Sequence, residues 1–232
     1  MKKAKILFVT AAVLGMLSGC AKFEPDGTAI LAEKEGNITA VVMETLDQSY
    51  YDSTELQNLI NQEVAEYNAS SGAESIVVKE FKAEDQTVSL TMDYVSGVDY
   101  AAFNNVTFFT GDVLGAYDAG YDFKTTFQYV EKGTVTNSHV TREEVLNSYN
   151  YYTVIMEEPM DLQVEGKIVY ASSNVQITGK NTCRVMPETT VRAETEETEP
   201  VTLEDGTVVL APTSITTHGR DGSRELAYIL YE

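Results

Sequence analysis

Basic residues, cysteine and tryptophan are scarce in this chain of 232 residues. It contains 16 lysines and arginines against 36 acidic residues, with two cysteines and no tryptophan. Nucleic acids are held chiefly by basic side chains that neutralise their phosphates, so a nucleic-acid partner is not expected. Because Cys20 and Cys183 are the two cysteines of the chain, a thiolate zinc cluster is excluded.

Catalytic and metal-binding motifs are missing as well. His139 and His218 do not form a spaced ligand pair, and the chain has neither a Gly-x-Ser-x-Gly nucleophile elbow nor a phosphate-binding glycine loop. Residues 118–122 and 204–206 are acidic but lack the frame of a calcium loop. We therefore expect no metal or other cofactor and no enzymatic activity. Carboxylates are abundant, so an extracytoplasmic hydrolase that uses a carboxylate pair, for example on glycans, stays open as an alternative.

The N-terminus has the pattern of an export signal. Residues 1–5 are basic, and residues 6–16 form an uncharged run of 11 residues, whereas a membrane span needs about 20. The run is followed by Leu17-Ser18-Gly19-Cys20, which resembles the lipobox of bacterial lipoprotein precursors. In such a box, small side chains fit the signal peptidase, and only a thiol can form the thioether to diacylglycerol.

This resemblance predicts how the protein is placed. It implies removal of residues 1–19 by cleavage between Gly19 and Cys20, a diacylglycerol anchor on Cys20, and an acyl chain such as palmitate on the new amine. The protein would then be held at the extracytoplasmic face of the cell membrane, or at the outer membrane if the bacterium has one, because Ala21 is not the aspartate of inner-membrane retention. Two acyl chains suffice for stable anchoring, since each buried methylene contributes about 0.8 kcal/mol.

The charge of the processed chain favours contact with the membrane through lipid alone. Residues 1–19 contain three lysines and no acidic residue, so the chain from Cys20 has 13 basic and 36 acidic side chains, a formal charge of −23. This charge repels an anionic lipid surface. With Cys20 lipidated, Cys183 has no disulfide partner, and we expect it to face the core of a strand.

The body is predicted to be α+β, with mixed or antiparallel sheets, one long helix and one or two short ones. After a lipidated tether at residues 20–27, an α+β domain is expected over residues 28–150. Its patterns are strands at 28–33 and 38–44, a helix from Asp52 or Ser53 to about residue 68, strands at 75–81, 87–94 and 123–130, one helical turn at 99–103, and a short helix opened by a capping box at 141–144.

Residues 151–232 are predicted to be mostly β. Strands are expected at 154–157, 162–164, 167–171, 175–178, 182–186, 207–210, 214–217 and 226–231, interrupted by an acidic loop at 187–200. Residues 111–117 form a glycine-punctuated aromatic stretch with no clear assignment.

Tyrosine is the one enriched aromatic class, with 14 residues. Tyrosines fill half-buried strands, but exposed ones can also form a contact surface for a glycan or a protein. The prediction is a non-enzymatic binding or structural lipoprotein of the cell envelope, with an envelope protein or glycan as its ligand. A transporter substrate-binding component is a further alternative, although the pattern lacks the two α/β lobes of that class. The tyrosines in question are Tyr50, Tyr51, Tyr94, Tyr100, Tyr117, Tyr121, Tyr149, Tyr151 and Tyr152.

Overall fold

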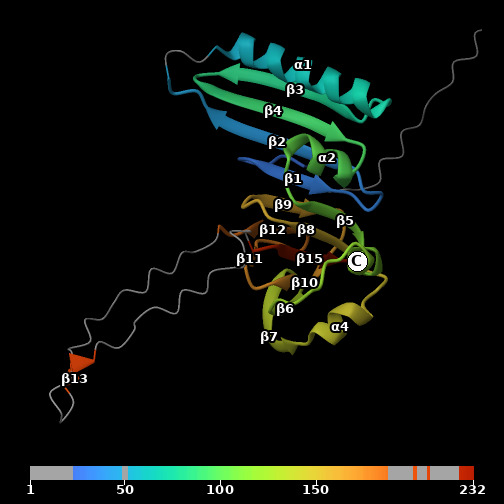
Figure 1. The fold of residues 1–232 in the computed structure, drawn as a ribbon, viewed down its shortest axis with the longest axis vertical. Helices are drawn as coiled ribbons and strands as arrows, with labels where there is room; N and C mark the ends of the chain where they lie inside the picture. The colour runs from blue at the N-terminus through green and yellow to red at the C-terminus, as the bar shows by residue number, and fades with distance from the viewer. Residues whose placement is uncertain (1–22, 49–51, 188–200, 203–207, 210–224) are drawn as a thin grey trace, which may run out of the picture.

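A computed structural model describes residues 23–48, 52–187, 201–202, 208–209 and 225–232. Within these ranges the fold is α+β, with four helices and two large sheets (Figure 1). This confirms the predicted fold class. The helices are α1 (Ser53–Ser71), α2 (Gly97–Asn104), α3 (Val113–Asp118) and α4 (Arg142–Asn147). None of the helices in the described ranges has the length and apolar composition that crossing a bilayer requires.

The two large sheets draw on both ends of the chain. Sheet A has the strand order β11 (Val175–Ile177), β12 (Thr182–Val185), β9 (Asp161–Val164), β1 (Ala29–Ala32), β2 (Ile38–Thr45), β4 (Thr87–Tyr94) and β3 (Ile76–Glu84). Sheet B has the order β5 (Phe108–Asp112), β8 (Tyr152–Met156), β15 (Ala227–Tyr231), β10 (Ile168–Ser172), β6 (Phe127–Glu131) and β7 (Thr134–Val140). A separate two-stranded ladder joins β13 (Val201–Thr202) to β14 (Val208–Val209).

Strand pairing crosses the predicted domain boundary in both sheets. In sheet A, β9 lies parallel to β1, and Ala29 is paired with Asp161. In sheet B, β8 is antiparallel to β5, and β10 is antiparallel to β6. Residues 28–150 and 151–187 therefore build both sheets together, and a division into domains at residue 150 stays a prediction.

The core strands follow the side-chain alternation that the sequence predicts. Val88, Leu90, Met92 and Tyr94 of β4 point inward and are all buried, while the residues between them lie on the other face. Side chains of a strand alternate between the two faces of a sheet, so an apolar residue at every second position gives one buried face. β15 is apolar at every position, because both of its faces are covered.

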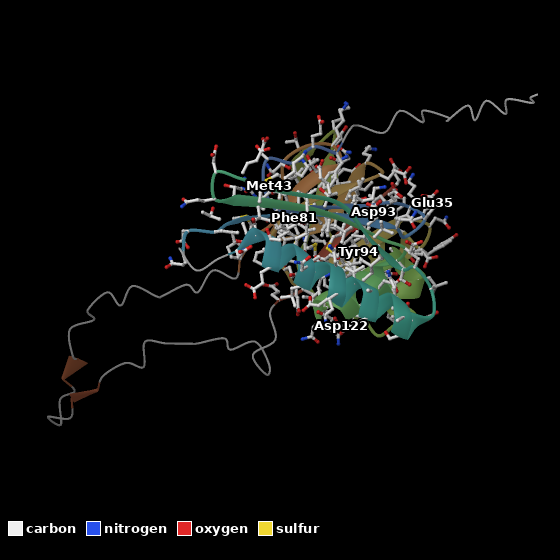
Figure 2. All side chains as sticks on the ribbon, turned by 90° about the horizontal axis from the view of Figure 1, so that it is seen from above. Glu35, Met43, Phe81, Asp93, Tyr94 and Asp122 are labelled. Carbon is white, nitrogen blue, oxygen red and sulfur yellow. The ribbon has the colours of Figure 1, made fainter. Side chains whose placement is uncertain are left out.

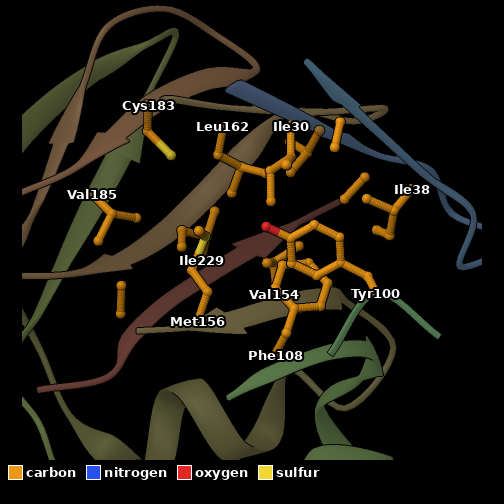
Figure 3. Close-up of a cluster of buried hydrophobic side chains, with 14 of the residues drawn as sticks. Ile30, Ile38, Tyr100, Phe108, Val154, Met156, Leu162, Cys183, Val185 and Ile229 are labelled. Carbon is orange, nitrogen blue, oxygen red and sulfur yellow. The ribbon is translucent and has the colours of Figure 1, made fainter. Parts of the chain in front are cut away.

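Two apolar clusters define the layers of the molecule. The larger one lies between sheets A and B: Ile30, Leu162 and Cys183 enter it from sheet A, and Val154 and Ile229 from sheet B (Figure 3). The smaller cluster lies on the opposite face of sheet B, where α3 and α4 cover it with Val113, Ala116 and Val145. Sheet B is thus the middle layer.

Helix α1 covers the part of sheet A that sheet B does not reach. It begins at the predicted cap, where the Asp52 carboxylate accepts hydrogen bonds from the amides of Thr54 and Glu55 at 2.8 and 3.1 Å. The Tyr67 hydroxyl donates to Asp99 at the start of α2 at 3.1 Å. Seen from above, β3 and β4 run beside this helix (Figure 2). Val64 is the one buried residue of α1.

Several segments differ from the sequence-based prediction, among them β5 and β13, which no predicted strand covers. The strand expected from Phe123 begins at Phe127, because Phe123 has a positive φ of 52° and turns the chain while its ring packs on Tyr228. The unassigned stretch at 111–117 is the end of β5 followed by α3. Strand β7 was not predicted, since its residues are polar and mostly exposed.

Some predicted features lie outside the described residues. These are the signal peptide at 1–19, with Leu17, Ser18, Gly19 and Cys20, most of the acidic loop at 187–200, and the strand expected at 214–217. The other predicted strands of the C-terminal part are present as β8 to β12, β14 and β15.

Candidate binding site

The residues singled out for chemistry do not converge. His139 lies exposed on β7, while His218 is outside the described residues, as is the acidic stretch at 204–206. In the described ranges, no three His, Cys, Asp or Glu side chains are placed to hold a metal ion. The Asp122 carboxylate accepts a hydrogen bond from the Lys124 amide at 3.0 Å and pairs with its ammonium at 2.9 Å, which lowers the pKa of Asp122.

Glu144 is a structural carboxylate. It completes the predicted capping box of α4, in which the Thr141 amide donates to Glu144 at 2.7 Å and the Glu144 amide donates to the Thr141 hydroxyl at 3.2 Å. The Thr141 hydroxyl also donates to the Glu144 carboxylate, at 2.9 Å, and the two hydrogen bonds that this carboxylate accepts lower the pKa of Glu144. A glycosidase acid needs the opposite shift, a raised pKa, so neither Asp122 nor Glu144 fits that role.

Cys183 lies in the core, as expected. It is 1% exposed on β12, and burial raises the pKa of its thiol to about 12. Reactive cysteines are partly exposed and have lowered pKa values, so this side chain is a packing residue.

The predicted tyrosine class divides into buried and exposed members. Tyr94 and Tyr100 are buried in the main core, with ring centroids 5.1 Å apart. The Tyr100 hydroxyl donates to Glu158 at 2.9 Å, and burial raises the pKa of Tyr100. Tyr117 and Tyr149, in contrast, are 51% and 59% exposed. Tyr50 and Tyr51 lie outside the described residues.

Strand pairing brings Tyr117 and Tyr149 together, although they are far apart in the sequence. β5 and β8 are antiparallel, and Asp112 at the end of β5 is paired with Tyr152 at the start of β8. The Val113 amide continues this ladder by donating to the Tyr151 carbonyl at 3.2 Å. Helix α3, which follows β5, therefore meets the end of α4, which precedes β8.

A shallow cavity opens where α3 meets α4. It has a volume of about 150 Å³ and is lined by Val113, Leu114, Tyr117, Leu146 and Tyr149, and we call it the tyrosine cavity. Leu114 is 56% exposed at its edge. Val113 and Ala116 face the core beneath it, so the cavity has a fixed floor. Large apolar side chains exposed together around a hollow are typical of a binding surface.

The helices around the tyrosine cavity carry mostly negative charge. With their caps, α3 and α4 include Asp112, Asp118, Glu143 and Glu144, against the single basic residue Arg142. The Arg142 side chain is directed to the Asp122 carbonyl, to which its Nε donates at 2.7 Å. The surface around the hollow is therefore acidic.

A second, larger concavity lies on the outer face of sheet A, beside the segment that leads to Cys20. It has a volume of about 520 Å³, and we call it the tether cleft. Arg184 and Asp161 form a two-pronged ion pair in its wall, with nitrogen to oxygen distances of 2.7 and 2.8 Å. The cleft is lined by residues 23–27, Ala29, Asp161, Leu162, Gln163, Thr178, Thr182, Cys183 and Arg184.

Comparison with known proteins finds no matching family model, no matching curated protein and no matching solved structure. The choice between the tyrosine cavity and the tether cleft as a binding site therefore rests on the side chains that line them. In the tether cleft the Arg184 guanidinium is engaged by Asp161, whereas the tyrosine cavity presents apolar groups to the outside. The tyrosine cavity is the stronger candidate for binding. Sequence alone could single out the tyrosines as a class but not the two that share a site.

Proposed function

We propose that the protein is a lipid-anchored extracytoplasmic lipoprotein with a non-enzymatic body that binds a protein partner through the tyrosine cavity. The anchor is supported by Leu17-Ser18-Gly19-Cys20 and the basic and apolar segments before them. The side chains of the two described cores lie between Ile30 and Tyr231. Cleavage after Gly19 removes none of them, as a removable signal requires.

The size of the tyrosine cavity carries the binding proposal. An apolar cavity of about 150 Å³ accommodates a group the size of benzene, so this one fits a single aromatic or aliphatic side chain. The rings of Tyr117 and Tyr149 add contact area at a small cost in conformational entropy. A sugar needs many polar partners for its hydroxyls, and the lining side chains supply only two tyrosine hydroxyls. A protein side chain is therefore favoured over a glycan.

The charge around the tyrosine cavity indicates which residues flank the partner's apolar side chain. The four acidic residues of α3 and α4 and their caps attract lysine and arginine and repel acidic segments. The proposed ligand is thus a segment with one apolar anchor and basic neighbours. Central apolar anchors that fill pockets contribute most of the affinity of such interfaces.

The anchor is tested by mass spectrometry of the membrane fraction. We expect the N-terminal peptide to begin at Cys20 and to carry the mass of a diacylglyceryl group. A chain that retains residues 1–19, or that has an unmodified Cys20, overturns the anchor.

The binding site is tested with labelled peptides and the protein in zwitterionic nanodiscs. We expect a Lys-Lys-Phe-Lys-Lys peptide to give a saturable rise in fluorescence anisotropy, and a Lys-Lys-Ser-Lys-Lys peptide to give none. Tyr117→Ser should weaken binding about tenfold, as loss of an interface hot spot does. The matched control is Val98→Ser, because Val98 is 77% exposed on α2, outside the cavity. Equal binding of both peptides, or equal loss in both variants, contradicts the proposal.

A further inference from the structure

The link between the predicted lipid and the folded body is very short. Phe23 is the first described residue, and residues 21 and 22 alone separate it from Cys20. Consecutive Cα atoms are about 3.8 Å apart, so three steps along the chain span at most about 11 Å. This limit holds for every conformation of the linking residues. Whatever surface Phe23 lies on is therefore held close to the lipid.

That surface is the outer face of sheet A. Residues 23–27 line the tether cleft together with Asp161 and Arg184. The neighbours of these two residues in the strands, Leu162 and Cys183, point the other way into the core between the sheets. Because side chains alternate along a strand, Asp161 and Arg184 face away from sheet B. Just beyond the tether, the Met43 amide donates to the Thr28 hydroxyl at 3.0 Å, which fixes the start of the body to β2.

The tyrosine cavity lies on the opposite side of the molecule. Moving inward from the tether, the layers are sheet A, the main core, sheet B, the smaller core and finally α3 and α4. Figure 3 shows the first three of these layers, with Cys183 and Leu162 on one side of the main core and Val154 and Met156 on the other. Packed sheets are separated by about 10 Å, and a helix adds a layer of about 10 Å. Roughly 20 Å of protein thus separates sheet A from the cavity helices.

We infer that the outer face of sheet A around the tether cleft is turned toward the anchoring lipid leaflet, and that the tyrosine cavity faces the aqueous compartment and takes its partner from there. This inference rests on the proposed lipid anchor at Cys20. The short tether keeps residues 23–27 and the tether cleft near the lipid, whereas the cavity helices lie on the far side of both sheets.

The orientation is tested by quenching from the lipid surface. Thr178→Cys places a label at the tether cleft, and Asn147→Cys places one on α4; both native side chains are exposed. Cys183 should stay unlabelled, because it is buried and burial raises the pKa of its thiol to about 12. Each lipidated, labelled protein is reconstituted into phosphatidylcholine vesicles with and without a lipid that bears a nitroxide on its headgroup.

We expect the nitroxide to reduce the fluorescence of the label at position 178 and to leave that at position 147 unchanged. Equal quenching at both positions, or stronger quenching at position 147, overturns the orientation. The mass of the N-terminal peptide is measured on the same preparation. An unmodified Cys20, with protein that does not sediment with the vesicles, overturns the anchor itself, so the two failures are distinguished.

Discussion

The inner face of sheet A is covered in two different ways. Where it packs on sheet B, Leu162, Val164 and Cys183 are at most 1% exposed. Where it lies under α1, Ile76 of the sheet is equally buried, at 1% exposed, but the helix itself has Val64 as its one buried residue and leaves Leu59 51% exposed. Two sheets interlock along their whole faces, whereas a single helix meets a sheet along one stripe. The difference teaches that one sheet can be covered at one end by a second sheet and at the other by a helix that keeps most of its own residues exposed. We expect the layer between the sheets to be the more rigid of the two and the helix layer to open more readily.

The largest effect is expected from a substitution between the sheets. Ile229→Ala on the central strand β15 leaves a cavity in the main core and should lower the free energy of unfolding by about 2–5 kcal/mol. Urea unfolding followed by circular dichroism measures this. Val98→Ala, at an exposed position on α2, should change stability by less than about 0.5 kcal/mol. Similar losses in both variants would contradict the assignment of the rigid layer.

Alkaline pH should lower the free energy of unfolding, because Cys183 is buried in the core between the two sheets. Burial raises the pKa of this thiol from 9.0 to about 12. Between these two pH values the Cys183 thiol is neutral in the folded protein but ionised in the unfolded chain. The associated stability is complete below pH 9 and is lost as the pH rises toward 12. The expected loss is roughly 1 kcal/mol per pH unit for this group, read from urea midpoints between pH 8 and 11. Tyr94 and Tyr228, whose pKa values burial raises to about 12, should add to the loss above pH 10.

A matched variant separates the thiol from the tyrosines. Cys183→Ala is less stable at neutral pH, but its free energy of unfolding should fall less steeply between pH 9 and 10. Identical slopes in the two proteins would show that Cys183 is not the group responsible.

The smallest effect is expected at α1. Asp52→Ala removes the two capping hydrogen bonds at the start of the helix and should cost about 1 kcal/mol. If α1 opens independently, hydrogen exchange should accelerate in α1 and stay unchanged in β15. Leu59→Ala serves as the control, because half of that side chain is already exposed. Equal acceleration in both elements would mean that helix and sheets open as one unit.

Much of the fold was predictable because local signals agree with tertiary packing. The alternation in β4, the cap at Asp52 and the capping box of α4 each depend on neighbouring residues and were confirmed. Strand β7 was missed because it exposes most of its residues and shows no apolar alternation. The site was not predictable, because Tyr117 and Tyr149 meet only through the pairing of β5 with β8. Lipidation at Cys20 stays a prediction.

The position of β15 has a consequence for the order of folding. Residues 227–231 lie between β8 and β10, so without them sheet B is divided into β5 with β8 on one side and β10, β6 and β7 on the other. Sheet B can therefore be completed only after residues 227–231 have been made, so its two parts stay unjoined while the preceding residues are synthesised.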